Sequence, residues 1–257
     1  MKRSDANFIV VKNLDLGYGD RVVLRDINFT INRGDIFVIM GMSGCGKSTI
    51  MRSVVGLLRP MRGNILVDGT DLWAVDDDAR KKVIEKFGVS FQSGALFSSM
   101  TVGENVALPI ELKSCLSAQK IRERVREKLK IVGMAGCENL YPAQISGGMI
   151  KRVALARALV TEPDTLFFDE PSAGLDPVRS AELDQLILDI NRMHGTTIVM
   201  VTHELPTIMS IATNSVYIDC DTRSVASCGA PRNILNTTKN PQIIEFLTRG
   251  KSHGGKK

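Results

Sequence analysis

The chain has 257 residues, of which 44% are hydrophobic and 24% are charged, and these ordinary globular values argue against a disordered chain. Its length suits one large α/β domain better than two independent domains. The formal net charge is 33 − 28 = +5, which permits an anionic partner such as a nucleotide, a lipid surface or a nucleic acid without identifying one.

Segments that target a chain to a membrane or for secretion are not expected. No apolar run approaches the ~18 residues of a spanning helix, and MKRSDANFIV at the start lacks the apolar core of a signal peptide. The cysteines are odd in number and form no C-x-x-C pair, which argues against a disulfide framework or a zinc site and favours a reducing cytoplasm. They are Cys45, Cys115, Cys137, Cys220 and Cys228.

The first third of the chain alternates apolar and polar residues, which predicts antiparallel strands. One strand is expected over 14–18, before a turn at Gly19-Asp20, with Leu14, Leu16 and Tyr18 on one face, and another over 27–31. The apolar run 36–40 predicts a strand buried on both faces. A Gly-rich loop and a helical stretch to about Leu58 follow.

The rest of the chain alternates helices and strands. Asp76-Asp77-Asp78 is expected to cap a helix that stops near Gly88, and a short strand then leads to Gln92. Residues 93–140 contain an amphipathic helix and are expected to form a helical insertion. From Ser146 onward the order helix, strand, helix, strand predicts a parallel sheet, and the polar tail 251–257 is expected to be disordered.

Residues 41–49 fit the pattern G-x-x-x-x-G-K-[ST] between a buried strand and a helix. Glycines let main-chain N–H groups converge on phosphate oxygens, and the helix N-terminus adds a positive dipole. Lys47 would approach the β- and γ-phosphates and the Ser48 hydroxyl would bind Mg²⁺. Because Lys47 and the helix N-terminus also favour a thiolate at Cys45, bulky thiol reagents are expected to react there.

Polar residues follow three of the predicted strands. Asp169 and Glu170 end an apolar strand, where an open α/β sheet places its ligands; Asp169 would hold Mg²⁺ and Glu170 would polarise the attacking water. Gln92 and His203 each follow a strand, and either residue could be a plain polar residue at a strand exit, which is the favoured interpretation for a histidine taken alone. His203 lies one βαβ unit after Glu170, which brings the two strand ends to one sheet edge.

Ser146-Gly147-Gly148-Met149 precedes a helix. Ser146 is a natural N-cap, and the same hydroxyl, two glycines and helix dipole would also suit an anion. From this segment alone, simple capping and a second anion site remain equally good interpretations.

Together these motifs resemble the ATP-binding subunit of ABC transporters, in the order of that family and over roughly residues 7–225. Tyr18 stands where the family places an aromatic ring that stacks on adenine, although a core tyrosine is the alternative. The matching segments are the phosphate loop Gly41–Thr49, Gln92, the signature Ile145–Met149, the acidic strand Leu166–Glu170, the loop Ser172–Asp176 and His203.

The resemblance implies an α/β fold, a P-loop NTPase core with a mainly parallel sheet, an N-terminal antiparallel β subdomain and an inserted helical subdomain at about 93–160, within a single domain 1–250. It implies a Mg²⁺-dependent ATPase with Glu170, His203 and Lys47 as catalytic residues, and Ser48, Gln92 and Asp169 at the metal. ATP would be bound by Tyr18, Gly41, Ser43, Gly44, Cys45, Gly46, Lys47, Ser48, Thr49 and Gln92, and from a second copy by Ser146, Gly147 and Gly148.

Two departures from the common family pattern narrow the subfamily. Met149 replaces a glutamine, and Gln92 is followed by Ser93–Phe97 and then Thr101–Ala107. This combination resembles the ATPases that work with mammalian-cell-entry lipid-binding proteins, so the expected cargo is phospholipid or a related hydrophobic molecule. An ordinary importer of a small polar solute is the alternative, and a non-transport ATPase acting on ribosomes or DNA is a remote one.

The expected partners also follow from the resemblance. They are a second copy in a head-to-tail dimer with ATP between the copies, permease subunits whose coupling helix would enter a groove in 93–140, and a mammalian-cell-entry-type lipid-binding protein. No nucleic-acid partner is expected. The chain would be a peripheral protein on the cytoplasmic face of the inner membrane.

Overall fold

The computed structural model describes residues 7–113 and 115–249. The chain forms two compact units, one made of the residues up to Arg80 together with those from Val199 onward, and one made of Lys81–Ile198. The tail predicted to be disordered, 251–257, lies outside the described residues. Among the described residues no helix is both long and apolar enough to cross a membrane.

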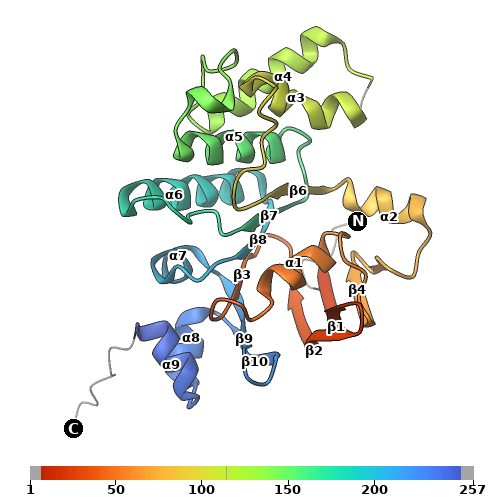
Figure 1. Ribbon diagram of the computed structural model, residues 1–257, viewed down its shortest axis with the longest axis vertical. Helices are drawn as coiled ribbons and strands as arrows, with labels where there is room; N and C mark the ends of the chain where they lie inside the picture. Colours follow the sequence, from red (N-terminus) through yellow and green to blue (C-terminus); the bar gives the residue numbers. More distant parts are fainter. Residues whose placement is uncertain (1–6, 114, 250–257) are drawn as a thin grey trace. The chain divides into compact units, whose positions relative to one another are not determined.

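The first unit begins with an antiparallel sheet in the strand order β2-β1-β4-β5 (Figure 1). Strands β1 and β2 form a hairpin whose last pair is Tyr18 and Arg21. The apolar residues predicted to face the core are buried, with the exception of Tyr18. The buried ones are Leu14, Leu16, Ile27, Phe29 and Ile31. These strands are β1 (Ile9–Tyr18), β2 (Arg21–Ile31), β4 (Arg62–Val67) and β5 (Thr70–Asp71).

Tyr18 departs from the predicted face. Irregularities in the β1–β2 pairing, between Leu14 and Leu16 and between Leu16 and Gly17, break the period of two. Tyr18 is therefore 47% exposed, whereas Leu14 and Leu16 are buried. The interpretation as a core tyrosine is wrong.

The second sheet has the strand order β10-β9-β3-β8-β7-β6. In the first unit β3 pairs parallel with β9, and β10 closes the edge antiparallel to β9; in the second unit β6 pairs parallel with β7. The α/β fold with one antiparallel and one mainly parallel sheet is therefore confirmed. The strands are β3 (Ile36–Met40), β6 (Phe87–Ser90), β7 (Thr165–Asp169), β8 (Thr197–Val201), β9 (Asn214–Asp219) and β10 (Ser224–Gly229).

The helices of the first unit are short. Helix α1 ends at Val54, four residues before the predicted end, because Gly56 adopts a left-handed φ of 83° and the N–H groups of Gly56 and Leu57 return to the carbonyls of Ser53 and Arg52. This is a Schellman ending. The helices are α1 (Lys47–Val54), α7 (Leu205–Ile211), α8 (Pro231–Thr237) and α9 (Pro241–Thr248), with α2 (Asp77–Ile84) crossing into the second unit.

The helices of the second unit include the predicted amphipathic one. In α4, Val125 and Leu129 are buried, and Figure 1 draws α3, α4 and α5 together. Helix α2 ends at Ile84, earlier than predicted, because β6 starts at Phe87. The helices are α3 (Val102–Lys113), α4 (Ala118–Ile131), a 3₁₀ turn (Pro142–Gln144), α5 (Gly147–Leu159) and α6 (Pro177–His194).

A capping box and a buried asparagine organise the start of α3. Thr101 and Glu104 exchange hydrogen bonds, with Thr101 N–H donating to the carboxylate at 2.7 Å and Glu104 N–H to the hydroxyl at 3.2 Å. The fully buried Asn105 accepts from Phe97 N–H at 2.8 Å and donates to the carbonyls of Phe97, Met100 and Thr101 at 3.0–3.1 Å. The segment 97–105 is therefore clamped by one side chain.

Candidate functional site

The phosphate loop lies in the first unit, between the fully buried strand β3 and helix α1. Gly41 cannot carry a side chain, because a Cβ would lie 2.5 Å from the Ile218 carbonyl oxygen. Gly44 and Gly46 have φ of 83° and 88°, a region that side chains disfavour. The glycines thus permit the bend that the sequence predicts.

Lys47 is the buried cation of this loop, at 6% exposure. Its ammonium donates to the carbonyls of Gly41 at 3.0 Å and Met42 at 2.8 Å. The loop therefore already holds a positive charge on its inner side, next to the N-terminus of α1.

The residues of this loop fit a Mg²⁺–triphosphate. The N-terminus of α1 carries the positive end of the helix dipole, which suits phosphate oxygens. The Ser48 hydroxyl on α1 is an oxygen donor, which Mg²⁺ prefers. The chemistry of the donor set thus matches the predicted ligand.

Tyr18 presents its ring to solvent and its hydroxyl to α1. Arg52 donates to the Tyr18 hydroxyl at 3.2 Å. A hydrogen bond with Thr49, helped by Arg52, lowers the Tyr18 pKa although burial opposes the shift. Both partners lie on the helix that follows the phosphate loop, so the exposed ring is held near the loop.

His203 also belongs to the first unit. It follows β8, its side chain is 51% exposed, and Nε2 lies 4.0 Å from a Glu204 carboxylate oxygen. The preceding Thr202 donates its N–H to the Ile39 carbonyl at 3.4 Å. Since Ile39 is in β3, the chain enters His203 beside the strand that leads into the phosphate loop.

The second unit brings three predicted residues to one sheet edge. In the parallel pair β6–β7, Ser90 lies opposite Phe168. Gln92 follows Ser90 by two residues, and Asp169 and Glu170 follow Phe168 directly. Glu170 has a left-handed φ of 50°, which turns the chain sharply after the acidic strand.

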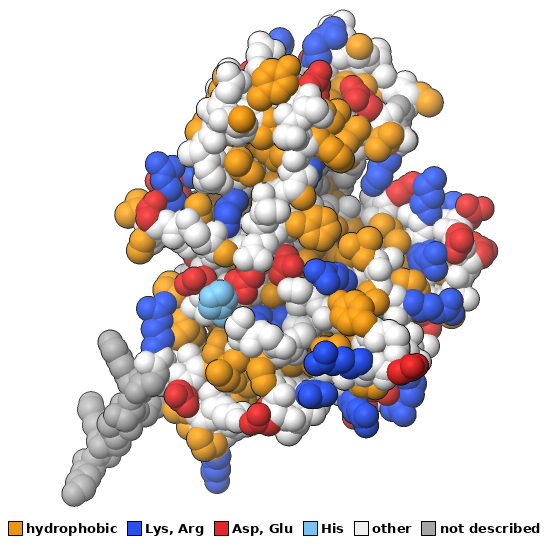
Figure 2. All heavy atoms as spheres, in the orientation of Figure 1, with side chains coloured by type: hydrophobic (Ala, Val, Ile, Leu, Met, Phe, Trp, Pro, Cys, Tyr) orange, Lys and Arg blue, Asp and Glu red, His pale blue; other side chains and the backbone are white. Residues whose placement is uncertain are grey.

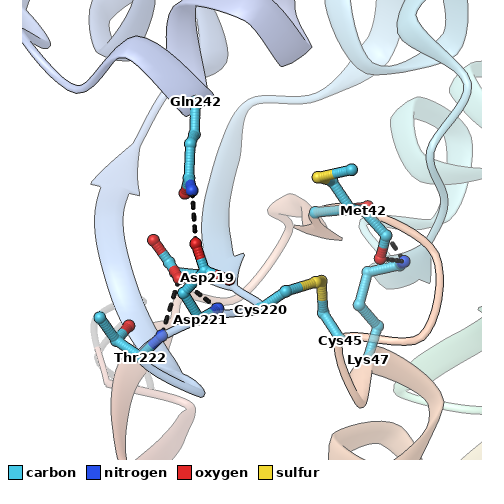
Figure 3. Close-up of a disulfide and its surroundings, with 9 residues drawn as sticks. Met42, Cys45, Lys47, Asp219, Cys220, Asp221, Thr222 and Gln242 are labelled. Atoms are coloured by element: carbon cyan, nitrogen blue, oxygen red, sulfur yellow. Dashed lines mark hydrogen bonds between the residues drawn. A yellow bond between two sulfur atoms is a disulfide. The ribbon is translucent and has the colours of Figure 1, made fainter.

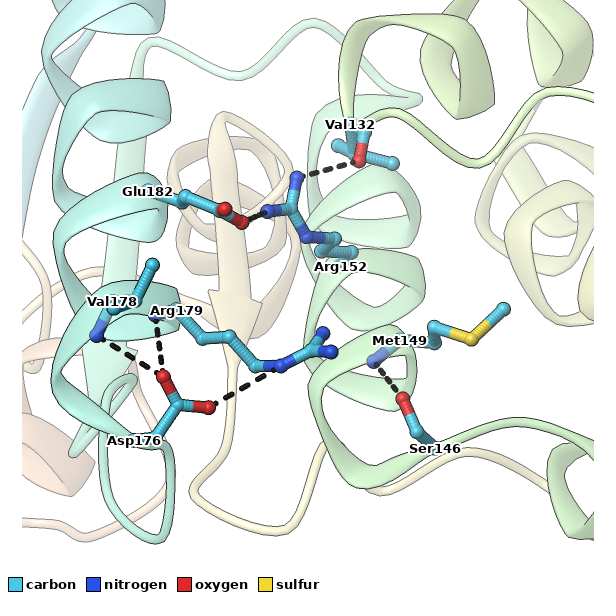
Figure 4. Close-up of polar contacts among 8 residues, drawn as sticks. All are labelled: Val132, Ser146, Met149, Arg152, Asp176, Val178, Arg179 and Glu182. Carbon is cyan, nitrogen blue, oxygen red and sulfur yellow. Dashed lines mark hydrogen bonds and ion pairs between the residues drawn. The ribbon is translucent and has the colours of Figure 1, made fainter.

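The Ser146 segment begins α5 in the same unit. The Ser146 hydroxyl accepts from the Met149 N–H at 3.3 Å (Figure 4), so the predicted N-cap is confirmed. The cap leaves the two glycines, Gly147 and Gly148, in the first turn of α5.

Lys151 was missed from the sequence. Its ammonium donates to the Pro171 carbonyl at 2.7 Å and also to the Ala173 carbonyl. Burial lowers the Lys151 pKa, and the charge of Glu170 partly opposes that shift. Lys151 therefore fastens α5 to the segment after Glu170. The signal in the sequence is its position, because Lys151 lies on the stripe of α5 that otherwise carries buried apolar residues.

Two further contacts hold the surroundings of α5 (Figure 4). Arg152 donates to Glu182 at 2.7 Å and to the Val132 carbonyl at 3.2 Å. Asp176 caps α6 by accepting from the N–H groups of Val178 and Arg179 at 3.1 and 3.0 Å. Arg152 of α5 thus contacts α6 and the residue that follows α4, and Asp176 holds the start of α6.

The cysteine expectations are corrected by the structure. Cys45 is joined to Cys220 by a disulfide with a Cα–Cα distance of 4.7 Å, so it is not the free thiol that the loop position suggests. The odd count and the lack of a C-x-x-C pair misled because the two partners are 175 residues apart. Cys115, Cys137 and Cys228 are free.

Comparison with known proteins identifies the family. Residues 24–173 match the ABC transporter family. A probable ribonucleotide transport ATP-binding protein, mkl of Mycobacterium leprae, is 41% identical over 93% of this chain and 68% of its own length; three other mycobacterial relatives of that name are covered over 66% of theirs. The intermembrane phospholipid transport system ATP-binding protein MlaF of Escherichia coli is 38% identical over 96% of this chain and 91% of its own length.

Solved structures support the same family assignment. CbiO1 of Clostridium perfringens, part of an ABC transporter complex, is 31% identical with a TM-score of 0.82, over 90% of this chain and 92% of that one. The dimeric cassette MJ0796 bound to ADP and Pi is 30% identical with a TM-score of 0.78, over 86% and 98%. The chain therefore belongs to the ABC transporter family and is an ATP-binding subunit with ATPase activity. Subunits of this class dimerise and work with membrane permeases.

Proposed function

We propose that this ABC ATPase powers the movement of phospholipid or a related hydrophobic molecule through partner membrane subunits. The observation that carries the proposal is its similarity to MlaF over nearly the full length of both chains. The altered signature at Met149 and the segment 101–107 support the same subfamily. The mycobacterial relatives, named for ribonucleotide transport, favour a nucleotide cargo as the second candidate.

The reaction is the hydrolysis of ATP to ADP and phosphate, in which catalysis rests on positioning and electrostatics. Lys47 and the loop N–H groups bind the triphosphate, and the exposed Tyr18 ring stacks on adenine. Glu170 orients and polarises the attacking water, and His203 faces the γ-phosphate. These roles rest on the local geometry of each unit and on the family motifs.

Ser48, Gln92 and Asp169 would hold magnesium in this proposal. The ion would supply positive charge that offsets the charge of the phosphate oxygens. These three side chains supply the hydroxyl, amide and carboxylate oxygens that this ion prefers. The loop N–H groups and Lys47 would bind the phosphate oxygens that the ion does not contact.

The dimer is head to tail, and the Ser146-Gly147-Gly148 segment of one copy serves the nucleotide of the other. Heterodimers isolated with two different affinity tags test this arrangement. A pair with Lys47→Ala in one copy and Ser146→Arg in the other keeps one intact site, whereas wild type paired with the double variant keeps none. We expect turnover only from the first pair; turnover only from the second would show that Ser146 serves its own chain.

The chain acts as a peripheral subunit on the cytoplasmic face of the inner membrane. Figure 2 shows hydrophobic side chains exposed over the helical part of the second unit. Phe97, Leu112 and Tyr141 are 52%, 79% and 46% exposed, and such patches mark interaction sites. They suit the coupling helix of a permease, within an inserted helical subdomain at about 93–160.

The cargo is tested on the complex purified in mild detergent through a tag on this chain and reconstituted into phosphatidylethanolamine–phosphatidylglycerol vesicles. We expect a mammalian-cell-entry-type lipid-binding protein to co-purify, and ATP-dependent transfer of labelled phospholipid that is lost with Glu170→Gln. Stimulation of turnover by ribonucleotides but not by phospholipid would favour the second candidate. Co-purification of a solute receptor would refute the lipid assignment.

A further inference from the structure

A covalent bond ties the phosphate loop to a distant turn of the first unit (Figure 3). Cys45 lies between Gly44 and Gly46 of the loop, and Cys220 directly follows β9. Their Cα atoms are 4.7 Å apart, within the range that a disulfide requires. The middle of the loop is thereby fastened to the β9–β10 turn.

This turn is a firm anchor. The Asp219 carboxylate accepts from the N–H groups of Asp221 and Thr222 at 2.7 and 2.9 Å, and Gln242 donates to Asp221 at 2.7 Å. The carboxylates beside Cys220 are therefore engaged in holding the turn and α9.

The disulfide also restrains the loop that carries Lys47, the cation proposed to bind phosphate. Lys47, two residues after Cys45, donates to carbonyls of its own loop (Figure 3). An ammonium has three N–H donors, so triphosphate binding exchanges only part of the bonding of Lys47 to loop carbonyls for bonding to phosphate oxygens, and any adjustment of the loop around the anion accompanies this exchange. A loop fixed at Cys45 resists this exchange.

The bond also borders a cavity. A cavity of about 180 Å³ is lined by both cysteines, Gly44, the segment 21–23 and Arg223. Arg21 and Arg223 give it two positive charges, which favour an anionic small molecule. Disulfides of proteins in a reducing compartment are usually transient and either catalytic or redox-sensing. An ATPase works in the compartment that supplies ATP, and in a reducing cytoplasm its disulfide is therefore expected to be reversible.

We propose that Cys45 and Cys220 form a reversible thiol–disulfide modification site, whose co-reactant is a small anionic disulfide and whose oxidation lowers the affinity of the phosphate loop for ATP. The inference rests on the proposed function only in that the loop binds ATP. Its physical basis is the tether between the phosphate loop and a firm turn, together with the cavity that both cysteines line.

The chemistry balances as thiol–disulfide exchange. The Cys45 thiolate attacks one sulfur of the small disulfide, forming a mixed disulfide and releasing one small thiolate. The Cys220 thiolate then attacks the Cys45 sulfur and releases the second. Two electrons reduce the small disulfide, and the two protons lost by the cysteines pass to the released thiols; reduction runs the same steps backward.

Linkage makes the proposal quantitative. If oxidation weakens ATP binding by a given factor, bound ATP must disfavour the disulfide by the same factor. We expect about tenfold, within the range common for coupled sites.

The test is a redox titration of the full chain in mixtures of glutathione and glutathione disulfide, with and without a saturating non-hydrolysable ATP analogue. Acid quenching, alkylation and peptide mass spectrometry measure the Cys45–Cys220 link, and binding of a fluorescent ATP analogue to the fully oxidised and fully reduced protein measures affinity. We expect a linked peptide, about tenfold weaker binding in the oxidised form, and a midpoint shifted by the same factor with the ATP analogue.

Matched variants identify the site. In oxidant, Cys220→Ser, or Cys220→Ala as a second version, should stop at the mixed disulfide on Cys45 and give no Cys45–Cys220 peptide, and in reductant it should bind ATP like the reduced wild type; Cys228→Ser should retain the full redox response. Absence of the linked peptide, or equal affinity of the two wild-type forms, would overturn the proposal. If the reduced protein failed to bind ATP, both the proposed effect on ATP affinity and the proposed ATPase function would be refuted. The peptide map would still show whether the Cys45–Cys220 disulfide forms.

Discussion

Replacing Lys151 by methionine should loosen the segment after Glu170. The change keeps an unbranched apolar side chain on α5 and removes the ammonium that donates to the Pro171 and Ala173 carbonyls. Hydrogen bonds to charged groups contribute about 1.5–3 kcal/mol each, so two of them would give about 3–6 kcal/mol. Burial of the ammonium, which lowers the Lys151 pKa, offsets part of that.

We therefore expect a net loss of about 2–3 kcal/mol, reported as a melting temperature lower by roughly 4–12 °C for a chain of this size. Turnover should fall by about 10- to 100-fold, because small displacements of positioned groups are costly in rate. ATP affinity should stay within a few-fold, because Lys151 is not part of the phosphate loop.

Scanning calorimetry and steady-state ATPase assays on the same preparations measure both effects. Lys130→Met, which changes an exposed lysine of α4, is the matched control and should behave as wild type. Lys151→Arg keeps charge and donors and should restore part of both losses. A Lys151→Met protein that melts and turns over like wild type would refute the role assigned to this lysine.

Three further predictions concern single side chains. Glu170→Gln should lower turnover by about 10²- to 10⁴-fold, the usual contribution of a general base, while ATP affinity stays within a few-fold and the ATP-bound dimer accumulates; wild-type turnover would remove Glu170 from the mechanism. Asn105→Leu should cost about 3 kcal/mol or more in urea unfolding, because it leaves the Phe97 N–H and several carbonyls without their partner; an unchanged midpoint would contradict this. Lys128 donates to Glu162 at 3.2 Å and lowers the Glu162 pKa below its ordinary 4.5, so the stabilisation exists above about pH 4.5 and disappears as the pH falls below that value. Glu162→Gln should thus lower the melting temperature at pH 7 but not at pH 3, and an equal loss at both would show a packing effect.

The phosphate loop could be predicted from the sequence because its chemistry is local. Glycines, Lys47 and Ser48 are neighbours in the chain, and they dictate a bend, a charge and a hydroxyl with little help from the rest of the protein. The N-cap of Ser146 is local in the same sense. The strand ends at Gln92 and Glu170 followed from a general rule, because the carboxyl ends of parallel strands meet at one edge.

A sequence motif can be recognised without its physical role being visible. The segment 101–107 served only to narrow the subfamily, whereas in the structure its Thr101 and Glu104 cap α3 and its Asn105 clamps the preceding segment. Tyr18 was placed on the wrong face because irregular pairing broke the alternation on which the prediction depended.

The remaining features depend on contacts between segments that are distant in the chain. Cys45 and Cys220 are 175 residues apart, and Lys151 is about 20 residues from the carbonyls that it holds. No local propensity encodes such a pair, because each partner alone is an ordinary residue on its own element. Only the packing of α5 against the chain after β7, and of the phosphate loop against the turn after β9, brings these atoms within bonding distance.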